Sequence, residues 1–392
     1  MLTDPKLENL FADMYHETRA SVMDREAHLF DRMASARKDT LVLFGAGPLG
    51  QATLSGLRKI GIHPLCFCDN NASLWGSSID GLEVLSVAAA VERYKDVGCF
   101  VVTVYNGSSP RRQLRDLGCQ CVMNFAVLYW KYADQFIPSS CMGLAHPMWD
   151  DEDNIRLGYS VLADEHSRTL FREQLQWRLN LDSDRMLPPS PVSETYFPSD
   201  IIMPIPDEVL VDCGAFDGDS IKAFLSCRNN QVARIYALEP DRKNRVKLEQ
   251  YKESLPRDLA ARISILPFAV GKQSGYVDFE SGNLVRSRIS LAAKGEATEC
   301  RTLDEICDGA GTTYIKMDIE GSEPEAIEGA TQVLNRNLPV LAACVYHRWE
   351  HLWQIPALIR SITSHHRIFL RRYAEDCWEL VCYAVPTHRL ID

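Results

Sequence analysis

The order of apolar and polar residues along the chain predicts two successive blocks of alternating strands and helices. In the first block, short apolar runs predict strands at 40–44, 62–69, 98–104 and 119–124. In the second block, similar runs predict strands at 208–212, 234–239, 263–269, 314–318, 339–345, 366–370 and 379–384. Helical periodicity follows most of these runs, which is typical of a mostly parallel α/β sheet. The fold class is therefore α/β, with two Rossmann-like domains.

Two further segments show helical periodicity or many prolines. We divide the chain into a helical arm (1–39), a first α/β domain (40–150), a helical segment with an extended Pro-rich connector (151–206), and a second α/β domain (207–392). A short loop joins the last two predicted strands, so we expect an antiparallel hairpin there. The arm is interpreted as a packing or dimer-forming element, which predicts a homo-oligomer built through the amino-terminal helices.

The composition excludes several classes of partner. The 392 residues carry a net charge of -11, which argues against a polyanion-binding surface and so against nucleic acid as a partner. The sequence has neither a signal-peptide pattern nor an apolar window long enough to span a membrane. The thirteen cysteines have no zinc-ligand spacing and are interpreted as buried free thiols. A cytoplasmic protein without a membrane partner is expected.

A glycine-rich turn opens the second block. In VDCGAFDGDS, Asp212 ends a predicted strand, and Gly214 and Gly218 allow a close turn before a helix. This spacing differs from the three-glycine fingerprint that admits a pyrophosphate. The next strand ends in YALEP, which places Glu239 where a carboxylate accepts both hydroxyls of a ribose. A plain α/β turn is the alternative, but an adenosine with an amino-acid tail and no phosphate satisfies both acids, and S-adenosylmethionine is such a ligand.

Charged residues interrupt the apolar strand at 314–318. Alternation places Lys316, Asp318 and Glu320 on the face opposite the apolar side chains, and unpaired burial of such charges costs several kcal/mol each. We therefore expect them to face a cleft at the carboxyl end of the sheet or to pair with one another. Ser322 and Glu325 have the spacing of a capping box for the following helix.

Several segments resemble the motifs of one family. YIKMDIEGSEPEAIEGA resembles the hallmark segment of FkbM-type methyltransferases, and VDCGAFDGDS and YALEPD are similar to that family's first two cofactor motifs. CRTLDEI, YHRWEHLWQIPALIRSI and FLRRYAEDCWELVCYAVP extend the resemblance over residues 206–386. The resemblance implies a class I methyltransferase fold, with a mostly parallel seven-stranded sheet that ends in an antiparallel hairpin. It also implies methyl transfer from S-adenosylmethionine to a hydroxyl of a sugar or another small-molecule or glycan acceptor.

Site residues follow from these motifs. The cofactor-binding set comprises Asp212, Gly214, Ala215, Asp217, Gly218, Glu239, Ala269 and Asp318. The catalytic set comprises Asp318, Glu320, His347 and Lys316, in which a carboxylate or the histidine acts as base. Lys316 or a divalent cation could separate the two carboxylates; we expect no obligate metal. Ser287 and Arg288 are further candidates for the pocket wall, with a solvated loop as the alternative.

The first block carries a full G-x-G-x-x-G fingerprint. Gly45, Gly47 and Gly50 lie between a predicted strand and helix, and Asp69 ends the next strand. This region resembles the Rossmann-like modules that precede sugar-modifying domains. The open alternatives are a nucleotide or sugar-nucleotide site, a purely structural module, an NAD-dependent oxidoreductase or epimerase, and a non-enzymatic nucleotide-binding protein. A Tyr-x-x-x-Lys apparatus for hydride transfer is absent from the downstream sequence.

Overall fold

The structure is a computed structural model that describes residues 4–139, 141–182, 186–279 and 296–391. The chain separates into two compact units. The first comprises Met1–Asp151, Arg172–Pro188 and Ala374–Trp378, and the second comprises Glu152–Phe171, Pro189–Tyr373 and Glu379–Asp392. Both units therefore combine segments that are distant in the sequence, and the linear boundaries expected at residues 40, 151 and 207 stay predictions.

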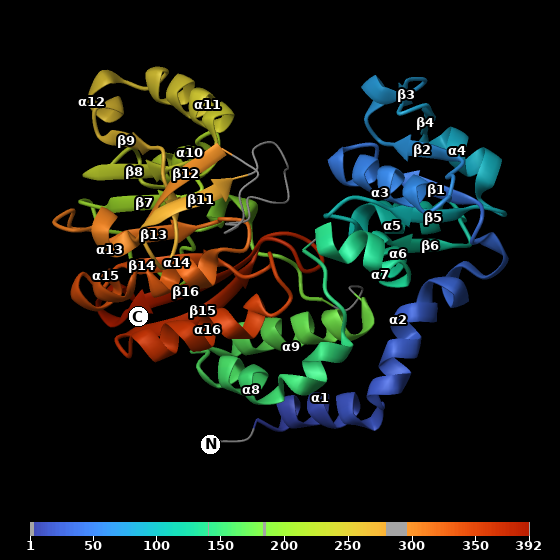
Figure 1. Cartoon of the computed structure of the whole chain (residues 1–392), viewed down its shortest axis with the longest axis horizontal. Helices are drawn as coiled ribbons and strands as arrows, with labels where there is room; N and C mark the ends of the chain where they lie inside the picture. Colours follow the sequence, from blue (N-terminus) through green and yellow to red (C-terminus); the bar gives the residue numbers. More distant parts are fainter. Residues whose placement is uncertain (1–3, 140, 183–185, 280–295, 392) are drawn as a thin grey trace. The chain divides into compact units, whose positions relative to one another are not determined.

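The first unit contains a six-stranded sheet in the order β3-β4-β2-β1-β5-β6 (Figure 1). All neighbours pair in parallel except β3 and β4. The strands are β1 (Leu41–Phe44), β2 (Cys66–Asp69), β3 (Ser78–Ile79), β4 (Leu82–Ser86), β5 (Cys99–Val102) and β6 (Val122–Asn124). The four strands predicted in this block are confirmed. The β3–β4 hairpin was not predicted, because its strands are short and only partly apolar.

Seven helices of this unit are described. They are α1 (Pro5–His16), α2 (Arg19–Ala34), α3 (Pro48–Lys59), α4 (Val87–Tyr94), α5 (Ser108–Asp116), α6 (Phe125–Lys131) and α7 (Ala133–Phe136). Thr18 caps α2 by accepting a hydrogen bond from the backbone N–H of Ser21 at 3.2 Å. Val22 and Phe30 of α2 are fully buried, and α2 lies against α6, so this part of the predicted arm packs within its own unit.

The second unit is built on a seven-stranded sheet in the order β15-β16-β14-β13-β7-β8-β9 (Figure 1). The strands are β7 (Val209–Cys213), β8 (Arg234–Leu238), β9 (Ile263–Leu266), β13 (Tyr314–Met317), β14 (Val340–Cys344), β15 (His366–Arg372) and β16 (Leu380–Pro386). The strands β7, β8, β9, β13 and β14 run parallel to one another, whereas β16 is antiparallel to both β14 and β15. The predicted parallel sheet with a terminal antiparallel hairpin is confirmed.

Helices and a small sheet complete this unit. The helices are α8 (Glu152–Ser160), α9 (Glu165–Asn180, which ends in the first unit), α10 (Asp219–Cys227), α11 (Arg242–Glu253), α12 (Arg257–Ala260), α13 (Leu303–Ile306), α14 (Glu323–Glu328), α15 (Thr331–Arg336) and α16 (His351–Ile362). The small sheet has the order β10-β12-β11, with β10 (Ala269–Val270), β11 (Gly275–Phe279) and β12 (Glu296–Arg301). The single strand predicted at 263–269 is divided into β9 and β10, because Pro267 has no N–H for a ladder hydrogen bond.

The Pro-rich connector differs from expectation. The sequence predicts an extended linker at 187–206, but Tyr196, Phe197, Ile201 and Ile202 belong to the core of the second unit. Prolines exclude a long helix here, yet the apolar residues between them pack against the sheet. Residues 189–206 of the connector are therefore part of the folded second unit rather than a spacer.

Candidate functional site

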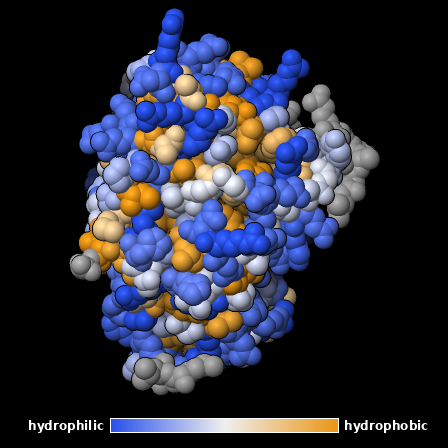
Figure 2. All heavy atoms as spheres, turned by 90° about the vertical axis from the view of Figure 1, so that its left-hand side faces the viewer, coloured by the Kyte–Doolittle hydropathy of each residue, from blue (hydrophilic) through white to orange (hydrophobic). Residues whose placement is uncertain are grey.

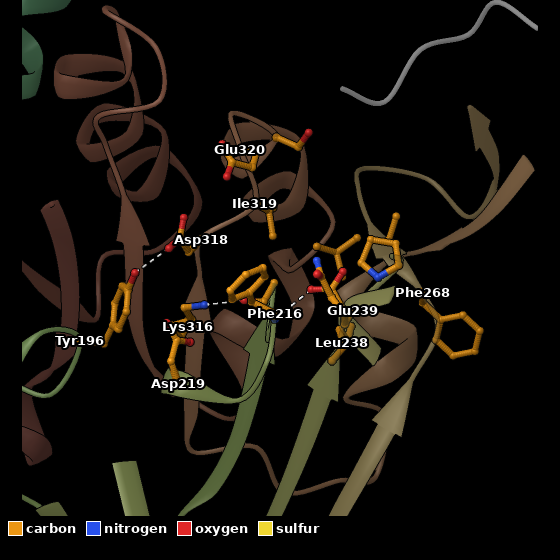
Figure 3. Close-up of a pocket in the computed structure, with 16 residues that line it drawn as sticks. Tyr196, Phe216, Asp219, Leu238, Glu239, Phe268, Lys316, Asp318, Ile319 and Glu320 are labelled. Atoms are coloured by element: carbon orange, nitrogen blue, oxygen red, sulfur yellow. Dashed lines mark hydrogen bonds between the residues drawn. The ribbon is translucent and has the colours of Figure 1, made fainter. Parts of the chain in front are cut away.

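A pocket of about 310 Å³ opens where β7, β8 and β13 end at their carboxyl termini (Figure 3). Ligands bind at this edge in open α/β sheets. The pocket is lined by residues from five segments, including Tyr196, Gly214, Phe216, Leu238, Glu239, Phe268, Ala269, Lys316, Asp318, Ile319 and Glu320. Six residues of the predicted set thus line one pocket: Gly214, Glu239, Ala269, Lys316, Asp318 and Glu320.

The turn after β7 needs its two glycines. Gly214 has φ +77°, and a Cβ atom on it would lie 2.0 Å from the carbonyl oxygen of Asp318. Gly218 has φ +95°, and a Cβ atom there would lie 2.6 Å from the ring of Tyr251. The left-handed conformation and the close approach both favour glycine. The turn therefore brings the ends of β7 and β13 together at the pocket.

Glu239 follows β8 and is 5% exposed. One carboxylate oxygen accepts a hydrogen bond from the N–H of Phe216 and the other from the N–H of Asp241, each at 2.8 Å (Figure 3 shows the former). Burial raises the pKa of this carboxyl, and the two backbone donors oppose the rise. Each oxygen keeps a second lone pair, so Glu239 can still accept hydroxyl donors from a ligand.

Lys316 and Asp212 form a buried ion pair between the neighbouring strands β13 and β7. The Lys316 Nζ lies 3.0 Å from a carboxylate oxygen of Asp212 and donates to the carbonyl of Gly214 at 2.8 Å. Ser220 donates to the other oxygen of Asp212. Burial alone would lower the pKa of Lys316, but the carboxylates of Asp212 and Asp318 raise it above its usual value. Asp212 is fully buried in this pair, contrary to the expectation that it faces a ligand.

Asp318 is held from two sides at the end of β13. Tyr196 donates its hydroxyl to Oδ2 at 2.7 Å (Figure 3), and His347 Nε2 lies 3.2 Å from Oδ1. Burial alone would raise the pKa of Asp318, but the hydrogen bond with His347 and the charge of Lys316 hold it well below its usual range. The sequence gives no signal for Tyr196, because it lies in the Pro-rich connector far from any motif.

His347 lies between carboxylates on both sides of its ring. Its Nδ1 is 2.8 Å from Oε1 of Glu323, and its Nε2 faces Asp318 and, at 3.8 Å, Glu320. Burial lowers the pKa of a histidine, but the charge of Glu323 and the hydrogen bonds to Glu323 and Asp318 raise that of His347 well above its usual value. Because both ring nitrogens face acceptors, His347 is an imidazolium that donates on both sides.

The predicted capping box at the start of α14 is wrong. Ser322 makes no side-chain capping hydrogen bond, whereas Pro324 does lie in the first turn. Glu323 is fully buried, accepts from the N–H of Ile319 at 3.0 Å and binds His347. The spacing of Ser322 and Glu325 favoured a cap, but sequence alone cannot show that Glu323, which lies between them, binds a histidine 24 residues away.

Three of these groups have the spacing of metal ligands. One atom each from Asp318, Glu323 and His347 lies within 4.8 Å of the other two. A metal ion needs a lone pair on a histidine nitrogen, whereas both nitrogens of His347 already face carboxylates. In this arrangement His347 bridges the carboxylates of Asp318 and Glu323, and the expectation of no obligate metal stays a prediction.

The remaining predicted residues lie around the same turn. Ala215 is fully buried and donates its N–H to the carbonyl of Leu238 at 3.0 Å, and Asp217 is partly exposed beside it. Asp219, which was not predicted, lines the pocket instead of Asp217. Ser287 and Arg288 lie outside the described residues.

The glycine fingerprint of the first unit adopts a strand–turn–helix geometry. Gly45 has φ +106°, and a Cβ atom on Gly50 would lie 1.9 Å from the carbonyl oxygen of Gly45, so helix α3 packs closely on the turn. Gly47 precedes α3 in open space. Asp69 accepts hydrogen bonds from the N–H groups of Ala46 at 2.8 Å and Asn71 at 2.7 Å. The acid expected to bind a ribose therefore already stabilises the glycine-rich turn.

The strand order of the second unit and its pocket at the carboxyl ends of the strands define a class I methyltransferase fold. The fold resembles the crystal structure of Methyltransferase FkbM from Methylobacillus flagellatus KT, with a TM-score of 0.71 and 22% identity, over 93% of this chain and 98% of that one.

Residues 212–376 match the family model described as the Methyltransferase FkbM domain. The chain thus contains an FkbM methyltransferase domain in its carboxy-terminal half. It is also 25% identical to the 2-O-methyltransferase NoeI of Sinorhizobium fredii (strain NBRC 101917 / NGR234), over 33% of this chain and 60% of that protein. The similarity therefore spans about three fifths of the length of this curated relative.

Proposed function

We propose that this protein transfers a methyl group from S-adenosylmethionine to a hydroxyl of a sugar or of another small-molecule or glycan acceptor. The observation that carries the proposal is the pocket in which Glu239, Asp318 and Gly214 meet at the carboxyl ends of β7, β8 and β13. The FkbM domain match supports methyl transfer, and the name of the Sinorhizobium relative supports oxygen as the accepting atom.

The residues of the pocket fit this cofactor. Its volume of about 310 Å³ lies within the range of small-molecule sites. Glu239 has lone pairs available for two ribose hydroxyls, and Phe216, Leu238 and Phe268 offer apolar surface for a purine. Asp219 is an exposed carboxylate in the pocket for an amino group. When bound, S-adenosylmethionine supplies an electrophilic methyl group on a sulfonium.

The protein's own residues must then position an acceptor and receive its proton. The predicted catalytic residues differ in their capacity to do so. His347 is already protonated, and Lys316 is paired with Asp212. Asp318 is a weak base, because its pKa is held well below the usual range. Burial raises the pKa of Glu320, which makes it the stronger base of the two predicted carboxylates.

Calorimetry with S-adenosylhomocysteine tests the cofactor assignment. We expect micromolar affinity for the native protein and a loss of roughly 100-fold or more in Glu239→Ala, because two hydrogen bonds to a charged acceptor disappear. Glu253→Ala, at the exposed end of α11, is the matched control and should bind normally. Absence of binding to the native protein would refute the cofactor. Transfer of radiolabelled methyl to a panel of mono- and oligosaccharides tests the acceptor.

The first unit is proposed to present the acceptor or to assemble an oligomer, with a purely structural role as the alternative. The sequence downstream of the fingerprint lacks a Tyr-x-x-x-Lys apparatus for hydride transfer, which disfavours an oxidoreductase. Titration with NAD tests this interpretation, since micromolar binding of NAD without binding of S-adenosylhomocysteine would overturn it. Light scattering of the purified protein tests the homo-oligomer.

Neither a membrane nor a nucleic acid is proposed as a partner. Among the residues that the structure describes, none of the helices combines the length and the apolar character needed to cross a membrane. On the face shown in Figure 2, hydrophobic side chains are interspersed with hydrophilic ones. The net charge of -11 is unfavourable for a polyanion.

A further inference from the structure

The antiparallel strand β16 brings one more acid to the pocket edge of the sheet. Its register with β14 pairs Val381 with Cys344, and the N–H of Val345 donates to the carbonyl of Leu380 at 2.9 Å. Because β16 runs against β14, the start of β16 lies beside the end of β14. Glu379, which precedes β16, therefore lies at the same edge as the residues that follow β14.

Glu379 has an unusual backbone and a carboxyl without a partner. Its φ of +50° is a left-handed conformation that costs a non-glycine residue about 1–3 kcal/mol and is concentrated at functional sites. Its carbonyl accepts from the N–H of Tyr373 at 3.0 Å, which fixes the backbone. Within the described part of the chain, the half-buried carboxyl of Glu379 makes no hydrogen bond or ion pair.

The neighbouring acids are already engaged. Asp212 binds Lys316, Asp318 binds Tyr196 and His347, and Glu323 binds His347 and the backbone of the turn. Glu239 accepts from two backbone N–H groups. Two described acids of the pocket stay open to a ligand: Glu320, 3.8 Å from the ring of His347, and the exposed Asp219.

Charges from several elements act on Glu379. Burial raises its pKa to about 7, and the carboxylates of Asp318 and Asp219 add to the rise. The positive charges of His347, after β14, and Lys316, on β13, oppose it. Tyr196, Tyr346 and Cys344 also interact electrostatically with Glu379. A carboxyl that titrates near neutral pH is well matched to general base catalysis.

We propose that Glu379 is the group that accepts the proton of the acceptor hydroxyl. The inference rests on the proposed function. In the step, the acceptor oxygen forms a bond to the methyl carbon, the bond from that carbon to the sulfonium sulfur breaks, and the electron pair of that bond stays on sulfur. The hydroxyl proton moves to a carboxylate oxygen of Glu379, which becomes a neutral carboxylic acid, and the cofactor becomes a neutral thioether.

Proton release on cofactor binding tests whether Glu379 lies near the bound cofactor, and it needs no acceptor. The cationic S-adenosylmethionine should lower the pKa of a nearby carboxyl, whereas the neutral S-adenosylhomocysteine should not. A fall of one unit at pH 7 corresponds to release of about 0.4 proton, which calorimetry in phosphate and in Tris measures. We expect the difference in proton release between the two ligands to persist in Glu253→Gln and to vanish in Glu379→Gln. Persistence in Glu379→Gln, or its loss in Glu320→Gln instead, would overturn the inference.

Stability as a function of pH supplies a readout that needs no ligand. A carboxyl with a raised folded pKa destabilises the protein as the pH rises from its usual pKa of 4.5 through about 7. Glu379→Gln should therefore gain Tm relative to the native protein, by roughly 5 °C, between pH 5 and 8. A difference in Tm between Glu379→Gln and the native protein that stays constant between pH 5 and 8 would contradict the titration of Glu379. Failure of the native protein to bind either ligand would instead refute the proposed function itself.

Discussion

The buried pair of Lys316 and Asp212 gives the strongest prediction for stability. Replacing Lys316 with Met removes the ammonium and leaves the carboxylate of Asp212 with Ser220 as its remaining side-chain donor. The side chains of the pair are 3% and 0% exposed, so solvent cannot replace the lost charge. Removing one partner of a buried pair costs about 3–5 kcal/mol. We expect Lys316→Met and Asp212→Asn each to destabilise the second unit by about this amount, and the double variant to recover at least about 2 kcal/mol.

Urea unfolding followed by circular dichroism measures these free energies. The transition that S-adenosylhomocysteine shifts to higher urea belongs to the unit that binds it. Lys272→Met is a matched control, because Lys272 pairs with Glu328 at 3.1 Å but is 57% exposed, and such surface pairs contribute about 1 kcal/mol or less. If Lys316→Met costs no more than Lys272→Met, or if the double variant is additive, the reasoning about the buried pair is refuted.

Four further predictions concern the pocket. Tyr196→Phe should cost about 1.5–3 kcal/mol at pH 7, because a hydrogen bond to an ionised carboxylate is lost. The pKa of the Asp318 carboxyl is depressed in the folded protein, so the difference in stability between Tyr196→Phe and the native protein should vanish as the pH falls through that pKa. A loss of stability that does not depend on pH in urea unfolding would contradict this prediction. The pKa of His347 is raised in the folded protein, so His347→Asn should lose its full stabilisation below about pH 6.5, and the loss should decline only as the pH rises well above that value. Urea unfolding between pH 5.5 and 9 measures this loss of stability. A loss that is absent at pH 6 would contradict a protonated His347. Gly214→Ala should destabilise the protein by roughly 2–5 kcal/mol through backbone strain and steric overlap. Gly275→Ala is the control and should be tolerated, since no atom lies within 4 Å of its Cβ position. Equal Tm values for the two variants would contradict the tight turn at Gly214. EDTA should leave the affinity for S-adenosylhomocysteine unchanged in calorimetry, and recovery of lost binding by Mg²⁺ or Mn²⁺ would establish a metal site.

The sequence by itself determined the fold class, the succession of strands in both blocks and six of the residues that line the candidate pocket. These features depend on local signals, namely apolar periodicity, glycines with φ values that other residues avoid, and acids at the ends of strands. Such signals lie within a few residues of one another, so Gly214, Glu239 and Asp318 could be assigned from the order of residues alone. The parallel sheet then places the ends of those strands together without further information.

Only the tertiary structure decided how the charged groups divide their partners. Lys316 pairs across to Asp212 rather than separating Asp318 from Glu320, because the register of β13 with β7 sets these residues opposite each other. Tyr196 reaches the pocket from a connector without a motif, and Glu323 binds a histidine 24 residues further along the chain. These contacts join residues far apart in the chain, and their protonation depends on burial and on neighbouring charge, which no spacing in a single sequence encodes.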